Sequence, residues 1–220
     1  IMKGHVARAI FRGTREDLQA IKGDLWRIGF RSERIKEHKT VSRIVNANGK
    51  ETAVIGKGLD FEVRNKPLCA LLSVLGAPNG DKVKIRTTVP EWIMKSGKAI
   101  KREFVAAYFG CELSTPKQRE KQKSSFRTPT FKLAKIRKED AAPFISSIEG
   151  ILKEFGISVA SVSQERGNRR KDGSESIISV IKISVKHDSL MNLYGKIGFI
   201  YSNKKEILSG LAYQYLKIKG

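Results

Sequence analysis

Apolar and polar residues change period several times along the chain, and each change predicts a new element. Residues 5–13 (HVARAIFRG) alternate between apolar and polar, which is typical of a half-buried strand. Residues 14–29 then place apolar side chains three or four apart, which predicts an amphipathic helix. Thr14, with Asp17 three residues later, is the expected N-cap of this helix, and Gly29 is its expected end.

The rest of the first half predicts a strand pair followed by a second helix. Residues 31–45 and 51–65 are the expected strands, and Asn48-Gly49 between them is a strong signal for a tight hairpin. The segment of residues 66–82 is expected to form a helix that is closed by the Gly-Ala-Pro sequence of residues 76–78.

The second half repeats this order of strand, helix, strand pair and helix. Asp188 is the expected N-cap of its last helix, and a hairpin tip is expected at residues 167–174. The expected elements are a strand at 131–138, a helix at 139–156, strands at 157–167 and 176–187, and a helix at 188–199.

Two internal matches support a repeat. Glu16-Asp17 corresponds to Glu139-Asp140, and residues 75–82 (LGAPNGDK) correspond to residues 197–204 (IGFIYSNK). The prediction is an α+β fold of two pseudo-symmetric α-β-β-α-type repeats. We assign residues 1–85 to the first repeat, 86–100 to a connection and 101–220 to the second repeat.

An apolar helix, expected at residues 103–113 (EFVAAYFGCEL), opens the second repeat and closes on one carboxylate, Glu112. The corresponding helix of the first repeat would precede His5 and is not in this sequence. We therefore expect the native chain to begin before Ile1.

Composition and charge restrict the function. The chain has 220 residues, 40% of them hydrophobic, which suits a folded protein with a real core. Its formal net charge of +21, spread over nearly every segment, favours a polyanionic partner, with nucleic acid first. A basic ribosome-associated structural protein remains an alternative. The chain has no apolar run of membrane-spanning length, and we expect it in the cytoplasm.

The few metal-binding residue types do not form a familiar site. Cys69 and Cys111 lack the spacing of a zinc site or a disulfide framework, and both lie in apolar stretches. We therefore expect both cysteines to be core residues. Trp26 and Trp92 are expected in the core as well.

Residues 104–113 resemble the signature helix of the LAGLIDADG homing endonucleases of the two-repeat, single-chain type. Small and apolar residues stand at positions 105–109, Cys111 takes the small position before the acid, and Glu112 takes the position of the acid. Residues 75–82 and 197–204 resemble the family's glycine-then-lysine segments. The chain departs from the pattern at Glu112, which replaces the usual aspartate, and at Leu113, which replaces the usual glycine.

The resemblance implies a site-specific, divalent-metal-dependent endonuclease that cuts both strands of a long, nearly palindromic DNA duplex. Glu112 would be a catalytic residue and a ligand of Mg²⁺ or another divalent cation. Lys82 and Lys204 would be catalytic lysines near the phosphate. The chain would act as a pseudo-dimeric monomer if it is longer in its native form.

The resemblance also implies that curved antiparallel sheets form a saddle whose outward side chains enter the major groove. No small-molecule substrate or membrane partner is expected. The expected nucleic-acid-binding residues are Arg12, Arg31, Arg34, Lys36, Lys117, Lys132, Lys135, Arg137, Gln164, Arg166, Lys182 and Lys186.

Two alternatives remain open at this point. A catalytically inactive protein on the same scaffold would bind DNA, or would bind RNA as an intron-splicing helper. A structural protein would show neither metal dependence nor sequence-specific duplex binding. The sequence therefore leans towards an enzyme without establishing one.

Overall fold

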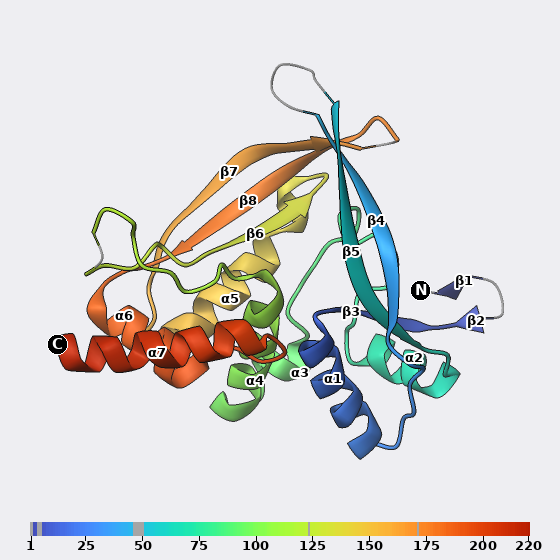
Figure 1. Cartoon of the computed structure of the whole chain (residues 1–220), viewed down its shortest axis with the longest axis horizontal. Coiled ribbons are helices and arrows are strands. Elements are labelled where there is room, and N and C mark those ends of the chain that lie inside the picture. Colours follow the sequence, from blue (N-terminus) through green and yellow to red (C-terminus); the bar gives the residue numbers. More distant parts are fainter. Residues whose placement is uncertain (1, 4–5, 46–50, 123, 171) are drawn as a thin grey trace. The chain divides into compact units, whose positions relative to one another are not determined.

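The computed structural model describes residues 2–3, 6–45, 51–122, 124–170 and 172–220 (Figure 1). The chain divides into two compact units, Ile1–Val74 and Leu75–Gly220. Each unit contains helices and a three-stranded antiparallel sheet, so the predicted α+β class is confirmed.

Unit 1 is built around the antiparallel sheet β3-β5-β4. Phe11 of β3 and Phe61 of β5 are register partners, and their rings stack at 5.0 Å on the face that also holds Val63. Leu18 and Leu25 pack against this face. The elements are β1 (Met2–Lys3), β2 (Val6–Ala7), β3 (Ala9–Gly13), α1 (Arg15–Arg27), β4 (Lys36–Val45), β5 (Glu51–Val63) and α2 (Lys66–Val74).

The first helix begins and ends as its sequence predicts. The Asp17 amide donates to the Thr14 hydroxyl at 3.3 Å, which confirms the N-cap. The helix ends at Arg27, and Gly29 follows with a φ of 87°, a conformation that glycine adopts without strain.

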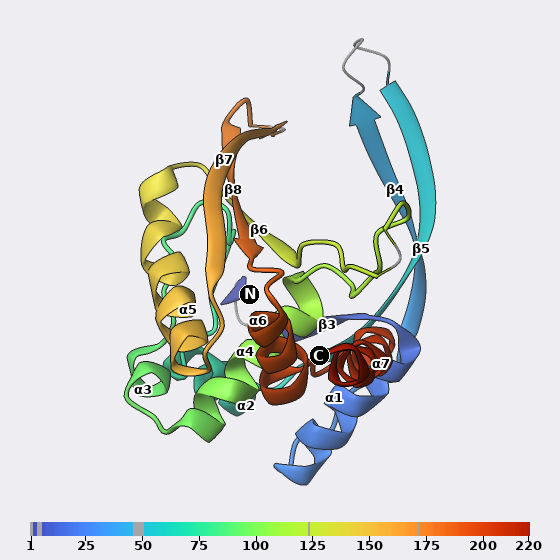
Figure 2. The same ribbon diagram turned by 90° about the vertical axis from the view of Figure 1, so that its left-hand side faces the viewer.

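Unit 2 has the sheet β6-β8-β7, whose inner face packs against α4 and α5 (Figures 1 and 2). Phe131 of β6 and Ile181 of β8 are register partners and almost fully buried on this face. The elements are α3 (Glu91–Met94), α4 (Lys98–Glu112), β6 (Thr130–Lys135), η1 (Lys138–Asp140), α5 (Ala142–Glu154), β7 (Val159–Arg169), β8 (Glu175–Ile183), α6 (His187–Asn192), η2 (Leu193–Ile197, a π-helical turn) and α7 (Asn203–Lys219).

The two sheets share one topology. In each, the third strand in chain order lies in the middle and pairs antiparallel with the other two. A helix follows the first strand and another follows the third strand in both units. This common order agrees with a repeat, while the saddle and the pseudo-symmetric pairing of the repeats stay predictions.

Several boundaries differ from the predictions. The strand expected from residue 31 begins at Lys36, and the residues before it form an irregular segment in which the Glu33 amide donates to the Glu62 carbonyl at 3.0 Å. Asp188 is not an N-cap: α6 begins at His187, and no side chain caps it. The Asn48-Gly49 hairpin tip lies outside the described residues.

The longest helix of unit 2, α7, was not predicted. Its buried Ser209, Ala212 and Leu216 recur at helical spacing. Ile207, Leu211 and Ile218 lie on its exposed side, and Ile218 is 87% exposed. We refer to these three residues as the α7 apolar stripe.

The aromatic and cysteine predictions are partly wrong. Trp26 is 72% exposed and Trp92 is 47% exposed, and the Trp92 indole donates to the Leu75 carbonyl at 3.0 Å. Cys69 is half-buried and Cys111 is exposed, so neither is a fully buried core residue.

The small residues of α4 have a clear packing role. A Cβ atom at Gly110 would lie 1.8 Å from the Ile200 carbonyl oxygen, so no side chain fits there. One turn earlier, the Ala106 carbonyl accepts from the Ile200 amide at 3.1 Å. Ala106 and Gly110 therefore let the segment around Ile200 lie directly against the helix backbone.

No helix in the described part of the chain has both the length and the apolar character needed to cross a bilayer.

Candidate functional site

The carboxylate at the end of α4 lies beside a lysine that the sequence also singled out. The Lys82 ammonium is 3.7 Å from Glu112 Oε1, and the two side chains are 76% and 37% exposed. The structure therefore brings together two of the three predicted catalytic residues. At this distance and exposure the pair contributes little to stability, so both groups are available to a ligand.

A buried lysine holds the backbone that carries Lys82. Lys135 is 1% exposed, and its ammonium donates to the Lys82 carbonyl, to the Ile85 carbonyl at 2.7 Å and to the Thr87 hydroxyl. Burial lowers the pKa of Lys135. Lys135 was predicted to bind nucleic acid, but the structure places it beneath the surface with all three ammonium protons engaged.

Residues 81–87 form an irregular segment, which we call the strap, and side chains from the β7–β8 hairpin also hold it. Asp81 pairs with Arg170, and Lys84 pairs with Asp172 at 2.5 Å. Hydrogen bonds from Lys84 and Ser174 lower the pKa of Asp172. The strap is therefore tied to one end of the sheet from two sides.

The far end of the strap rests on the segment after β6. The Thr87 amide donates to the Asp140 carbonyl at 3.0 Å. The carboxylate of Asp140 is buried, and Arg137 donates to it through two nitrogens at 3.1 and 3.2 Å. This bidentate pair raises the pKa of Arg137 and leaves its guanidinium 72% exposed.

The third predicted catalytic residue is not part of this group. Lys204 is exposed near the start of α7 and lines a separate groove with Pro116 and Leu211. Its neighbour Lys205 instead donates to the Gly110 carbonyl at 2.7 Å and the Phe109 carbonyl at 3.3 Å. A cation at the carboxyl end of α4 complements the unpaired carbonyls and the helix dipole there.

The predicted metal site is incomplete in the structure. Within the described residues, no three His, Cys, Asp or Glu side chains lie close enough to hold a metal ion. Glu112 supplies one carboxylate, and its nearest charged partner is Lys82. One acid beside a lysine is not a ligand set for Mg²⁺, so Mg²⁺ binding stays a prediction.

A buried phenol lies one helical turn before Glu112. The Tyr108 hydroxyl is buried without a hydrogen-bond partner, and its ring packs edge-on against Phe131 and Phe144. Burial raises the pKa of Tyr108, and the charge of Glu112 raises it further. The phenol therefore stays protonated near the foot of α4.

The register of the unit 2 sheet divides the predicted binding residues between its two faces. Lys132, Lys182 and Ser163 lie on the outer face, with Thr130 and Ser161 opposite Lys182. Gln164 pairs with Ser179 and Arg166 pairs with Ile177, so both lie on the other face, at the exposed part of β7. Ser161 and Ser163 therefore do not share a face with Gln164 and Arg166.

Unit 1 also has a charged outer sheet face. Arg12, Asp60 and Lys36 are register partners, and Arg12 Nε lies 3.8 Å from Asp60 while His38 Nδ1 lies 3.5 Å from it. Arg31 and Arg34 are exposed on the irregular segment before β4. On the outer face of the unit 1 sheet, cations alternate with carboxylates such as Asp60. This face is therefore less uniformly positive than the number of its basic residues suggests.

Most of the predicted cations have an acidic neighbour. These pairs are exposed and therefore weak, so phosphate can compete for the cations. They are Lys36 with Glu33 (2.6 Å), Lys117 with Glu120 (3.5 Å), Lys132 with Glu165 (2.9 Å) and Arg166 with Glu175 (2.5 Å). Lys186 is exposed immediately before α6.

The charge is unequal between the units. Unit 2 has 28 Lys or Arg against 14 Asp or Glu, whereas unit 1 has 15 against 8. The outer sheet face with Lys132 and Lys182, the strap with Lys82, and the basic residues around 117–127 all belong to unit 2. Unit 2 therefore offers the larger candidate surface for a polyanion, at about the same net charge per residue as unit 1.

The sequence comparisons match this chain to segments of longer proteins from Methanocaldococcus jannaschii. It is 45% identical over all 220 residues to the DNA-directed RNA polymerase subunit Rpo1N, of which the match spans 16%. It is 31% identical over 212 residues to the tRNA-splicing ligase RtcB, of which the match spans 21%. It is 24% identical over 220 residues to the replication factor C small subunit, of which the match spans 11%.

These relatives overturn the predicted homing endonuclease. They are named as a polymerase subunit, an RNA ligase and a replication factor, and no protein-family model matches the chain. The LAGLIDADG resemblance, the endonuclease function and its alternative as an inactive member of that family, and the association with intron or intein mobility are therefore corrected. Ala106, one of the small residues that carried the resemblance, has a structural explanation in the close packing of α4 against the segment around Ile200.

Proposed function

We propose that this chain is a nucleic-acid-binding module, and that unit 2 supplies most of its binding surface. The outer face of the β6-β8-β7 sheet carries the proposal, because Lys132 and Lys182 project from it among the hydroxyl groups of Ser161 and Ser163. Lysines placed among hydroxyls on an open sheet face suit contacts to the phosphate backbone.

The relatives support this proposal in a specific way. One segment of about the length of this chain lies within proteins named for three different activities, and most of each relative lies outside the match. The activity that each name describes is not common to the three. A segment that these three proteins share is therefore better explained by a property that all three have in common. Each of the three names refers to DNA, to RNA or to replication, so binding of nucleic acid is such a property.

Double-stranded DNA is the partner that we propose first, and RNA is the alternative. Lys132 on β6 and Lys182 on β8 are diagonal neighbours on one sheet face, and such a pair suits the regularly spaced phosphates of a duplex, which favours DNA. Lys82, beside Glu112 at the foot of α4, is proposed as a further phosphate contact. This contact would be oriented by Lys135 through the strap.

Salt-dependent binding tests the proposal. Binding to a random-sequence DNA duplex, measured by fluorescence anisotropy between about 50 and 200 mM salt, should weaken steeply, with a slope of log K against log salt of about −0.9 per phosphate neutralised. The double variant Lys132→Gln with Lys182→Gln should reduce that slope by about 2. Single-stranded DNA and duplex RNA serve as competing ligands that rank the partners.

A matched control isolates position from net charge. Lys153→Gln with Lys98→Gln removes the same number of charges from α5 and α4, on exposed helix positions away from the outer sheet face. This control should leave most of the slope intact. Equal losses in the two double variants would show that the molecule binds through overall charge alone, which would refute the proposed face.

A further inference from the structure

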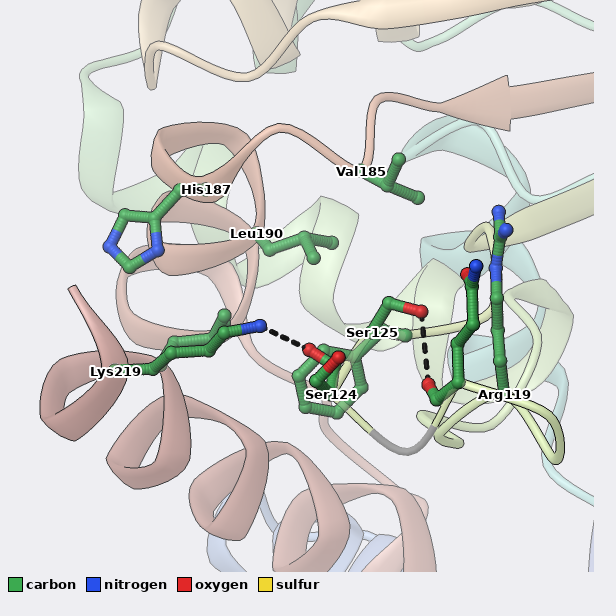
Figure 3. Close-up of a pocket in the computed structure, with 10 residues that line it drawn as sticks. Arg119, Ser124, Ser125, Val185, His187, Leu190 and Lys219 are labelled. Atoms are coloured by element: carbon green, nitrogen blue, oxygen red, sulfur yellow. Dashed lines mark hydrogen bonds between the residues drawn. The ribbon is translucent and has the colours of Figure 1, made fainter.

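Unit 2 contains a pocket that none of the features above uses. Its cavity has a volume of about 370 Å³ and is lined by three separate segments of the chain (Figure 3). Phe126, Leu190 and Leu216 form its buried apolar floor, and Arg119, Gln122, Ser124, Ser125, Val185, His187 and Lys219 complete its lining.

The floor of the pocket is well supported. The Phe126 ring packs edge-on against Tyr194 at 6.0 Å and Tyr215 at 5.8 Å, which anchors the loop that carries it. That loop is a short antiparallel turn in which Arg119 donates its amide to the Ser125 carbonyl at 2.9 Å. The polar side chains of the loop are therefore held at the rim rather than carried on a free segment.

Three basic side chains from three different segments surround this floor. Figure 3 shows His187 and Arg119 on opposite sides of the pocket with Leu190 between them. The His187 ring lies against Gly220, where an added Cβ would be 2.5 Å from Cε1. The Lys219 ammonium donates to the Ser124 carbonyl and lies 6.0 Å from the centroid of the Tyr215 ring, which leaves part of its donor capacity for a ligand.

We propose that this pocket takes a single unstacked nucleotide, such as one at a strand end or in a single-stranded stretch. The apolar floor would hold the base, and Lys219 and Arg119 would donate to the phosphates on either side of it. The volume suits one base with its sugar, and cations on two sides suit a residue of a chain that enters and leaves. The inference rests on the proposed nucleic-acid binding and names a ligand class for a second site.

Direct titration of the full chain tests this inference. Adenosine 5′-monophosphate, ribose 5-phosphate and inorganic phosphate are added in turn, and amide chemical shifts are followed by NMR. We expect the nucleotide to shift the amides of Ser125 and Leu190 and to saturate, with ribose 5-phosphate and phosphate about tenfold weaker or more, because they lack the base.

Paired variants separate the pocket from its surroundings. Val185→Trp should fill the mouth and abolish nucleotide binding, whereas Val162→Trp, at a position of similar exposure on β7, should leave it unchanged. Lys219→Gln should weaken nucleotide binding about tenfold. Lys217→Gln, two residues earlier on α7 with its ammonium over the Tyr213 ring, should not weaken it.

The outcomes also distinguish this inference from the proposed function. Duplex binding that persists in Val185→Trp while nucleotide binding disappears supports both. Equal nucleotide binding in the two tryptophan variants, or inorganic phosphate that binds as tightly as the nucleotide, would overturn the pocket and leave the sheet face untouched. Loss of duplex binding in the unaltered chain would instead overturn the proposed function.

Discussion

Replacing Lys135 by methionine tests whether one buried ammonium organises the strap. The change keeps most of the side-chain volume and removes three hydrogen bonds from a charged donor, to Lys82, Ile85 and Thr87. Hydrogen bonds to a charged group contribute about 1.5–3 kcal/mol each to stability. In the opposite direction, burying the charged Lys135 ammonium costs the unaltered chain several kcal/mol of desolvation free energy, and methionine avoids this cost.

The net effect of Lys135→Met follows from these opposing contributions. The strap is partly exposed, so water can reach some of the carbonyls that lose their donor. The loss of stability per hydrogen bond therefore lies near the low end of the range given above. We expect a destabilisation of about 2–3 kcal/mol, concentrated in local opening of the strap. A loss of about 2.7 kcal/mol corresponds to about a hundredfold change in an equilibrium constant.

Amide hydrogen exchange measures this opening directly. The Ile136 amide donates to the Val83 carbonyl at 3.1 Å, and the Thr87 amide donates to Asp140, so both report on strap attachment. Exchange at these two amides should rise about a hundredfold in Lys135→Met, while the buried Ile148 of α5 changes less.

Lys132→Met is the matched control for this prediction. It lies on the same strand, is exposed, and loses only the pair with Glu165, so its effect should stay within about 0.5–1 kcal/mol. If the two variants raise exchange at Ile136 and Thr87 equally, or if Lys135→Met raises it at neither amide, then Lys135 does not hold the strap.

Three further predictions concern local features. Thr14→Ala should lower the stability of unit 1 by about 1 kcal/mol in urea unfolding followed by circular dichroism, because one amide of α1 loses its cap; an unchanged midpoint would contradict the cap. Gly110→Ala should destabilise unit 2 by about 3 kcal/mol or more, because its Cβ would meet the Ile200 carbonyl. Gly150→Ala on α5 has open space around the added Cβ and should stabilise the protein by about 0.5–1 kcal/mol. Thermal unfolding of both variants checks that the two effects have opposite signs. The folded-state pKa of Asp172 is depressed, so this carboxylate stabilises the fold above its unfolded pKa of 3.8 and loses that contribution as the pH falls below 3.8. The melting temperature of Asp172→Asn should therefore fall less on acidification than that of the unaltered chain. Parallel curves of melting temperature against pH would refute this.

Local signals in the sequence were reliable where one residue decides the backbone. Thr14 and Gly29 bound α1 as expected because a cap and a left-handed turn depend only on neighbouring residues. The strand order within each sheet also agrees with the repeated pattern of elements. The Trp26 prediction failed because size and apolarity say nothing about which side of a helix has a partner.

The site was harder to predict because its geometry depends on long-range packing. Lys135 alternates with Phe131 and Leu133 and so shares their inner face, but its three acceptors lie about fifty residues away in the chain and only the structure reveals them. Lys204 and Lys205 are neighbours, and no local pattern distinguishes the lysine that reaches α4 from the one that does not. The family resemblance singled out Glu112 and Lys82, which the structure places 3.7 Å apart. It also implied a function that the relatives contradict.

The α7 apolar stripe has a consequence for how this protein behaves in solution. The stripe exposes apolar surface at Ile207, Leu211 and Ile218 on a molecule of net charge +21. Electrostatic repulsion between copies therefore keeps them apart at low ionic strength. Added salt shortens the range of that repulsion to about 10 Å at 0.1 M and leaves the attraction between the stripes intact. Colloidal stability should therefore fall as salt rises, and Leu211→Lys should restore it by giving the stripe its own charge.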